Sequence, residues 1–424
     1  MINNKESQEN SGLNKERFLD YINKFSFPRL AGTEGEEKAV NLTIKTFREK
    51  DFNENEIFTQ NFEFSTFYSI TMMKIIILMN LIFIATIFLI KYLYPFLTFF
   101  SILILLLIFL SMLKVLRHPE LRGFWEKHFG NFIKATNVFV KIPATNDLSQ
   151  KVGDIIVSAH LDSKSQSFKT IWRVIIIRIW LYSEIFLFLF YIFFLVDYHF
   201  YEQINRIVEI LWEIFIITGT ILTVVSNAFL LFLNIENDSP GALDNATGMS
   251  IVFELSSLFK KSPLHNFNLW FCQFSGEEIG TMGSRQFLDM FDKKFTKKYT
   301  YQINFDMVSI TNNKRNFIEY IKSYGIVPRK KISPILSQYF INSAEIKRVN
   351  YHGFHVSLGA HTDSIPFHLR KFDSIDITTR AAAKYTHSAE DTPDKVDPQI
   401  LLDAYKVIRL LIQSLDKDYN KLIK

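Results

Sequence analysis

Two adjacent carboxylates, Glu277 and Glu278, have the clearest chemical potential in this sequence. They lie in the segment 273–284 (QFSGEEIGTMGS), directly after an apolar run that is typical of a buried strand. Like charges repel there, and loss of hydration is costly for both groups. A bound cation would remove that cost. We therefore predict that Glu278 binds a metal ion and that Glu277, beside a metal-bound water, accepts a proton.

A histidine and an aspartate two residues apart follow another apolar run. His160 and Asp162 lie in 158–163 (SAHLDS), after the apolar segment 154–158 (DIIVS). An imidazole can bind a metal through one ring nitrogen while a nearby carboxylate accepts a hydrogen bond from the other nitrogen. By itself, such a pair is more typical of an ordinary surface loop than of a metal ligand.

Three further segments carry a candidate ligand each. Asp244 lies in a loop rich in glycine and proline, 239–248 (SPGALDNATG), which is also compatible with a turn and a helix N-cap. Asp306 lies in 304–307 (NFDM), at the end of a further predicted strand, and His387 lies in 385–388 (YTHS). Because all these residues follow strands or lie in loops of one α/β domain, we expect them to meet at the carboxyl edge of its sheet.

In this order, the motifs AHLDS, GALDNATG, SGEEIGTMGS, NFDM and THSAEDTPD resemble the M28 family of metallopeptidases. The resemblance covers most of the polar part of the chain, from the segment 27–39 (FPRLAGTEGEEKA) to the C-terminal helix. It implies an aminopeptidase that hydrolyses the N-terminal residues of peptides with two Zn²⁺ ions per chain. A hydroxide shared by the two ions would be the nucleophile.

The resemblance also implies a role for each matching residue. His160 and Asp306 would hold one zinc, Glu278 and His387 the other, and Asp244 would bridge the two. Glu277 matches the general base and Asp162 the acid that orients His160. Asp363, in GAHTDSIPF, matches a segment near the substrate cleft more loosely.

Two other functions compete with this interpretation. The first is a one-zinc aminoacyltransferase of the glutaminyl-cyclase kind, which resembles the same family. The second is a non-catalytic membrane receptor or scaffold with the same fold. The complete set of ligand types for two metals, together with Glu277, favours the peptidase.

Composition narrows the range of partners. The net charge of +5 is small for 424 residues, and no run of lysine and arginine that could follow a phosphate backbone occurs, so we do not expect nucleic acid as a partner. The single cysteine, Cys272, cannot form an internal disulfide. Residues 1–25 are polar and predict no secretory signal. The sequence carries no signal for an oligomeric state.

Four apolar blocks, 75–90, 96–113, 179–196 and 214–233, predict two transmembrane hairpins in contact with a lipid bilayer. Buried helices of a large soluble core are the alternative. Lysines and arginines gather on the side of the polar segments, since only Lys91 and Arg206 lie in the hairpin turns. The positive-inside rule then predicts a multi-pass protein with its peptidase domain in the cytoplasm.

The remaining segments predict an α/β domain with a mixed, largely parallel sheet flanked by helices, into which the two hairpins are inserted. Expected strands are 57–64, 135–142, 154–158, 268–274 and 300–305, and expected helices are 14–50 with a central turn, 248–259, 282–291, 328–340 and 399–415. The predicted organisation is peptidase domain at 1–67, 115–172 and 235–424, with hairpins at 68–114 and 173–234.

Overall fold

The computed structural model describes residues 15–69, 71–90, 95–115, 123–146, 152–200, 206–311, 317–325, 330–356 and 362–423. Residues 91–94 of the turn predicted between the first two apolar blocks lie outside the described residues. So do Arg117 and Arg122, two of the basic residues on the side of the polar segments, and His361, a histidine to which the sequence assigns no role.

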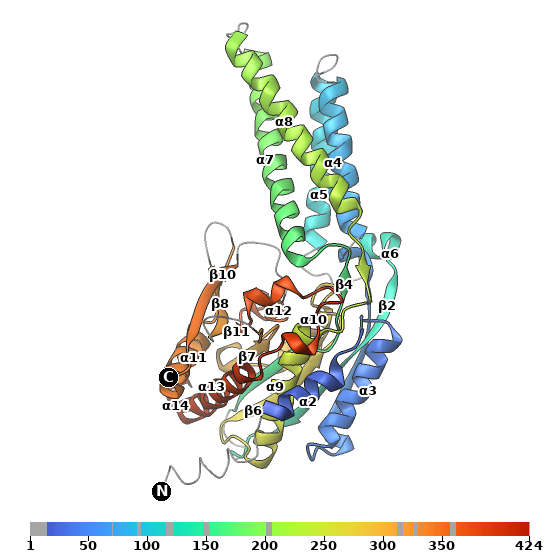
Figure 1. The fold of residues 1–424 in the computed structure, drawn as a ribbon. Helices are drawn as coiled ribbons and strands as arrows, with labels where there is room; N and C mark the ends of the chain where they lie inside the picture. The colour runs from blue at the N-terminus through green and yellow to red at the C-terminus, as the bar shows by residue number, and fades with distance from the viewer. Residues whose placement is uncertain are drawn as a thin grey trace. The chain divides into compact units, whose positions relative to one another are not determined.

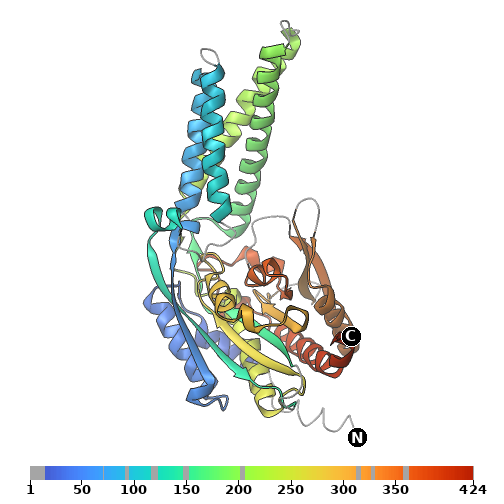
Figure 2. The same cartoon turned by 180° about the vertical axis from the view of Figure 1, so that it is seen from behind.

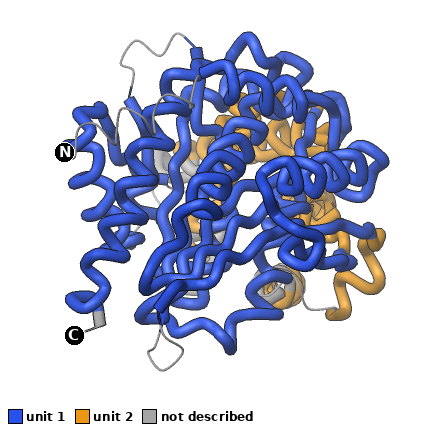
Figure 3. Tube along the Cα trace, turned by 90° about the horizontal axis from the view of Figure 1, so that it is seen from below, with its two compact units in different colours: residues 1–64, 133–166, 236–424 blue, residues 65–132, 167–235 orange. Residues whose placement is uncertain are grey.

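The chain forms two compact units (Figure 3). The first, called the α/β unit, comprises residues 1–64, 133–166 and 236–424. The second, called the helical unit, comprises residues 65–132 and 167–235. Residues 115–132 thus group with the helices, whereas the sequence prediction placed them in the peptidase domain. Their aromatic residues account for this, because the ring of Trp125 stacks on that of Phe67, also in the helical unit.

A mixed sheet forms the centre of the α/β unit, in the order β1-β2-β6-β3-β7-β11-β8-β10, with β9 paired to β8 (Figure 1). β3 pairs in parallel with both β6 and β7, and β11 pairs in parallel with β7. β2 runs antiparallel to β6. The strands are β1 (Ile57–Ser65), β2 (Phe132–Ile142), β3 (Gly153–His160), β6 (Phe267–Phe274), β7 (Thr300–Phe305), β8 (Ile318–Tyr324), β9 (Lys330–Lys331), β10 (Tyr351–Val356) and β11 (Asp373–Ile377). A separate short ladder joins β4 (Ser165–Gln166) to β5 (Ile235–Glu236).

Both faces of this sheet are covered. On β3, Ile155 and Val157 belong to the larger hydrophobic cluster, and Ile156 belongs to a second one. Since successive side chains of a strand point to opposite faces, the two clusters lie on opposite sides of the sheet. The helices of this unit are α2 (Lys15–Phe25), α3 (Glu34–Arg48), α9 (Thr247–Lys261), α10 (Met282–Phe291), α11 (Pro334–Lys347), α12 (Ser364–Leu369), α13 (Pro398–Lys417) and α14 (Tyr419–Ile423).

The central sheet flanked by helices confirms the α/β class that the sequence predicts. Each predicted strand has a counterpart, but β8, β10 and β11 were not predicted. β10 contains His352 and His355 of the segment YHGFH, for which the sequence by itself favours a loop with solvated histidines over a metal pair. The predicted helix at 328–340 corresponds to α11, which begins at Pro334 because proline is favoured in the first turn of a helix.

The helical unit contains α4 (Thr71–Ile90), α5 (Pro95–Val115), α6 (Phe124–Phe129), α7 (Thr170–Phe200) and α8 (Arg206–Leu231). α7 lies beside α8, and α4 beside α5 (Figures 1 and 2). One stretch of the described residues, Glu213–Leu231, is long and apolar enough to cross a membrane, and shorter apolar stretches occur at Thr71–Thr86 and Phe99–Ile108. The two transmembrane hairpins therefore stay a prediction.

Candidate metal centre

The predicted ligands come from different elements that the sheet brings to one edge. His160 is the last residue of β3, Asp306 directly follows β7, and Glu278 lies in the turn after β6. These three strands are parallel neighbours, so their carboxyl ends meet. Asp244 lies in the irregular turn Ala242–Ala246 before α9, and His387 lies in the loop between β11 and α13.

Two groups of ligand atoms result from this placement. In the first, Nε2 of His160 is 3.0 Å from Oδ1 of Asp244 and 3.7 Å from Oδ1 of Asp306. In the second, Nε2 of His387 is 3.2 Å from Oδ2 of Asp244 and 3.1 Å from Oε2 of Glu278. In each group one atom per residue lies within 4.8 Å of the others, so each group can hold a metal ion.

Asp244 belongs to both groups. Its Oδ1 atom faces His160 and its Oδ2 atom faces His387. A carboxylate that offers one oxygen to each of two groups can bridge two ions. The structure thus brings together all the predicted ligands, with Asp244 in the bridging place.

The surroundings of His160 direct its ring. Nδ1 lies 3.0 Å from the backbone carbonyl oxygen of Asp162 and 3.6 Å from the Oδ1 atom of that residue. With the proton on Nδ1, the ring donates to the carbonyl, and the lone pair of Nε2 points at Asp244 and Asp306. The Asp162 carboxylate also accepts hydrogen bonds from the backbone N–H groups of Glu277 and Glu278, at 3.3 and 3.2 Å. Asp162 therefore positions three site residues.

Burial gives these acids unequal pKa values. Burial opposes ionisation of Asp244, but His160 and His387 outweigh it through hydrogen bonds and charge, and they hold its pKa well below 3.8. Burial also raises the pKa of Glu278, yet the charges of His387 and Lys164 bring it down to about 2. Burial raises the pKa of Asp306 to about 6. Burial disfavours protonation of His160, but Asp162, Asp244 and Asp306 raise its pKa well above 6.5.

Glu277 lies beside the ligands without belonging to either group. It is 5% exposed, and its Oε1 atom has no hydrogen-bond partner in the described part of the chain. Burial raises its pKa well above 4.5, and the charges of Asp306 and Glu278 add to that shift, whereas His160 opposes it. A buried carboxylate with a free oxygen and a raised pKa is suited to accept and return a proton.

Asp363 is fully buried on the same side of the sheet. It immediately precedes α12, and its Oδ1 atom accepts a hydrogen bond of 2.6 Å from the Ser284 hydroxyl on α10. Burial raises its pKa to about 7. Its carboxylate therefore links α10, which follows the Glu277 turn, to α12.

Sequence reasoning missed Arg29, which joins the loops of two ligands. This fully buried guanidinium donates to the carbonyls of Leu161 at 2.6 Å, Pro240 at 2.6 Å and Gly241 at 2.9 Å, as well as to Phe25 at 2.7 Å. The loops of His160 and Asp244 are thus held by one side chain. The segment FPRLAGTEGEEKA was noted in the sequence, but its arginine carried no signal for this role.

Two other residues were missed. Asp391 accepts hydrogen bonds from the backbone N–H groups of Leu243 at 2.6 Å and Asp244 at 3.2 Å, and burial raises its pKa to about 7. Asp391 lies in the motif THSAEDTPD, two residues before the proline. Its presence in this motif is the only feature of the sequence that could have indicated a role at the site. Lys164 contacts Glu278, whereas in the sequence it is only one of the basic residues on the side of the polar segments.

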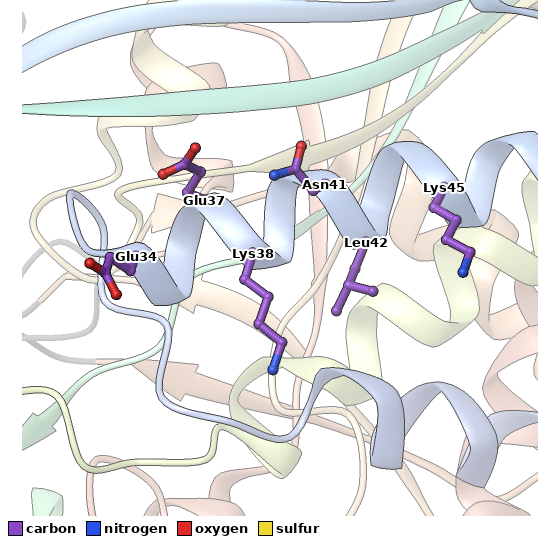
Figure 4. Close-up of a pocket in the computed structure, with 6 residues that line it drawn as sticks. All are labelled: Glu34, Glu37, Lys38, Asn41, Leu42 and Lys45. Atoms are coloured by element: carbon purple, nitrogen blue, oxygen red, sulfur yellow. The ribbon is translucent and has the colours of Figure 1, made fainter.

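The donor set fits zinc. Imidazole nitrogens and carboxylate oxygens are its ordinary protein ligands. The Oε1 atoms of Glu277 and Glu278 are buried and have no hydrogen-bond partner among the residues that the structure describes, so a metal ion bound beside them would offset the cost of burying these atoms. Elsewhere, a surface depression of about 540 Å³ is lined by residues of α3 alone, namely Glu34, Glu37, Lys38, Asn41, Leu42 and Lys45 (Figure 4). None of the candidate ligands lines it.

Comparisons with known proteins agree with this geometry. The model of Peptidase family M28 matches residues 225–412, which include all the ligands except His160. Aminopeptidase YwaD from Bacillus subtilis (strain 168) is 24% identical over 190 residues, which are 43% of this chain and 39% of that protein. The aligned part thus spans about two fifths of the length of that curated relative.

Solved structures show the same fold. BSAP, a zinc aminopeptidase from Bacillus subtilis, is similar with a TM-score of 0.53 at 14% identity, over 94% of each chain. A glutaminyl cyclase from an Acidobacteriales bacterium is similar with a TM-score of 0.52 at 13% identity, over 95% of each chain. By its fold and by the match over residues 225–412, this chain is similar to the M28 peptidases.

Proposed function

We propose that this protein is a zinc-dependent aminopeptidase that removes N-terminal residues from peptides at a centre of two metal ions. One observation carries the proposal: Asp244 is shared by two ligand groups, one with His160 and Asp306 and one with Glu278 and His387. A site for a single ion would not need a second complete group around the other oxygen of the same carboxylate.

The residues of the chain would divide the work. Bound zinc ions would act as Lewis acids that polarise the scissile carbonyl group and activate water. Glu277 would take a proton from the attacking water at its free Oε1 atom and pass it to the leaving amine. Asp162 would keep this carboxylate in place through the backbone N–H groups of Glu277 and Glu278.

Preference for a free N-terminus follows from coordination. A free α-amino group, once deprotonated, offers a nitrogen lone pair that can bind one of the two metal ions, and an internal peptide nitrogen offers no such donor. The name of BSAP as a zinc aminopeptidase and the name of YwaD support the same substrate class.

A glutaminyl-cyclase-like aminoacyltransferase is the second candidate, because a glutaminyl cyclase is among the similar structures. Such an enzyme would use one zinc. It would release ammonia from an N-terminal glutamine and close the ring without adding water.

We further propose that the helical unit anchors the protein in a lipid bilayer, with the α/β unit in the cytoplasm. Its helices expose many large apolar side chains, among them Leu78, Ile104, Leu107, Trp172 and Phe232, which are 57%, 58%, 58%, 59% and 69% exposed. An apolar surface of this extent is unsuited to water and suited to lipid. The positions of Lys74, Lys127 and Lys169 near the helix ends support the cytoplasmic side.

Zinc counting and product analysis test the enzymatic proposal. We expect two zinc ions per purified chain and release of free amino acid from aminoacyl reporter substrates. Exchange of His387 for alanine should lower the count to one, because it removes a ligand of one group only. One zinc in the unaltered protein, with cyclised glutamine as the product, would favour the transferase and reject the aminopeptidase.

A further inference from the structure

A buried lysine lies against one of the two ligand groups. The Nζ atom of Lys164 is 2.8 Å from Oε2 of Glu278 and donates a second hydrogen bond of 2.8 Å to the backbone carbonyl of Glu278. The same Oε2 atom is 3.1 Å from Nε2 of His387. One carboxylate oxygen therefore faces both an ammonium group and the nitrogen with which it would share a metal ion.

The loop that carries Lys164 is fixed on both sides. The Ser163 backbone N–H donates to the carbonyl of Arg29 at 3.2 Å, and the Gln166 N–H donates to the carbonyl of His387 at 3.1 Å. The side chains of Lys164 and Glu278 are 11% and 3% exposed, so water has little access to the pair. The ammonium group is thus part of the centre and not a solvated surface charge.

We propose that Lys164 weakens metal binding at the group formed by Asp244, Glu278 and His387, so that this group holds its ion less tightly than the group with His160 and Asp306. The inference rests on the proposed two-metal function and assigns unequal roles to its two ions. The ion beside Lys164 would be exchangeable, and the ion beside Asp306 would be retained.

Two physical effects act in the same direction. The ammonium group takes electron density from Oε2 of Glu278, which makes this oxygen a poorer ligand. Its positive charge also repels a dication at short range in a site with little water. The other group lacks such a neighbour, because the ion pairs of the described residues join Asp306 to His160 only.

Metal titration of variants tests this inference. Full-length protein in detergent is stripped with a chelator and titrated with Zn²⁺, and the two dissociation constants are measured by calorimetry and by competition with a chromophoric chelator. For Lys164→Met, we expect the weaker constant to fall by about tenfold or more, since partners just outside the ligands change metal affinity by 10- to 100-fold. The tighter constant should stay unchanged. Lys164→Arg keeps the charge and should resemble the unaltered protein.

Controls separate this role from a general effect on folding. Lys141→Met removes a lysine of the same unit, where the ammonium lies over the Trp270 ring, and should change neither constant. In a His387→Ala background, Lys164→Met should leave the single remaining constant unchanged. If Lys164→Gln, a polar alternative, is the variant that folds, the same shift is expected from it.

Several results would overturn the inference. Unchanged or weaker binding at both groups in Lys164→Met would show that the lysine does not oppose the metal. A change that persists in the His387→Ala background would show that it acts elsewhere. Binding of two ions that is insensitive to Lys164 would leave the aminopeptidase proposal intact, whereas failure of the unaltered protein to bind zinc would overturn both.

Discussion

At the scale of single residues, the centre contains two buried carboxylate oxygens, Oε1 of Glu277 and Oε1 of Glu278, that have no hydrogen-bond partner among the described residues. Glu277 and Glu278 are adjacent in sequence, yet their carboxylates have different surroundings. Glu278 meets His387 and Lys164, which lower its pKa to about 2. For Glu277, burial and the charges of neighbouring acids raise the pKa. The two roles of ligand and base follow from this difference in environment.

Exchange of Glu277 for glutamine is the sharpest test of the base. The amide keeps the shape of the side chain but cannot take a proton, so we expect a loss of about 10²- to 10⁴-fold in kcat with zinc content and melting temperature retained. The control is Glu37→Gln, which changes an exposed acid on α3. Near-normal turnover in Glu277→Gln would reject the assignment.

The Glu277 carboxylate should also set the pH dependence of kcat/KM. A base acts only when deprotonated, so kcat/KM should increase as the pH rises through the Glu277 pKa, which burial raises above 4.5. The acid limb of the profile should therefore lie above pH 4.5 and should be missing from the residual activity of Glu277→Gln. Measurement of both profiles with aminoacyl reporter substrates checks the sign.

At the scale of secondary-structure elements, buried hydrogen bonds hold the ligand loops at the sheet edge. Arg29 follows α2 and binds carbonyls of the loops after β3 and before α9. Asn245 donates to the carbonyl of Phe305 at 2.7 Å and thereby ties the Asp244 turn to the end of β7. The distances between ligands thus depend on side chains that bind no metal themselves.

Exchange of Arg29 for lysine should show this dependence. One ammonium cannot reach all the carbonyls that the guanidinium satisfies, and each unsatisfied buried group costs about 1 to 3 kcal/mol. We expect the free energy of unfolding to fall by roughly 3 kcal/mol or more, together with weaker zinc binding. Denaturant unfolding in detergent and metal titration measure the two effects.

The matched control is Arg48→Lys, in which an exposed arginine pairs with Glu54 on the surface and should change stability by less than about 1 kcal/mol. Equal, small effects of the two exchanges would contradict the role given to Arg29.

At the scale of the whole molecule, the sheet itself limits how the helical segments can be inserted. β1 and β2 flank the first insertion and are neighbours in the main sheet, and β4 and β5 flank the second insertion and pair with each other. Strands of one sheet must lie on one side of a membrane. Each insertion in a membrane-spanning protein would therefore cross an even number of times, as a helical hairpin does.

Membrane extraction tests this organisation. We expect the protein to stay in the membrane pellet after an alkaline carbonate wash and to dissolve only with detergent, because the apolar helix surfaces would otherwise face water. A C-terminal tag should resist protease added to the outside of intact cells. Release by carbonate would reject the bilayer proposal, and digestion of the tag would reject the cytoplasmic orientation.

Much of the site was present in the sequence. His160, Asp244, Glu278, Asp306 and His387 were predicted from short segments after strands or in loops and from the resemblance that these segments carry, because metal ligands must be particular residue types. Alternating and continuous apolar runs also predicted β1, β2, β3, β6 and β7, since the apolar pattern of a buried strand is contained in the residues of that strand. The strands β8, β10 and β11 escaped prediction because their pairing depends on distant partners, as in the parallel register between β10 and β8.

The sequence by itself determined which residue types gather at the centre, because the chemistry of a metal ligand resides in its own side chain. Only the tertiary structure decided which oxygen of Asp244 faces each histidine, and that Arg29, Lys164 and Asp391 surround the ligands. Those contacts join residues far apart in the sequence, as the 114-residue separation between Lys164 and Glu278 shows. No local pattern records a contact of that kind, since it exists only once the sheet has brought its strand ends together.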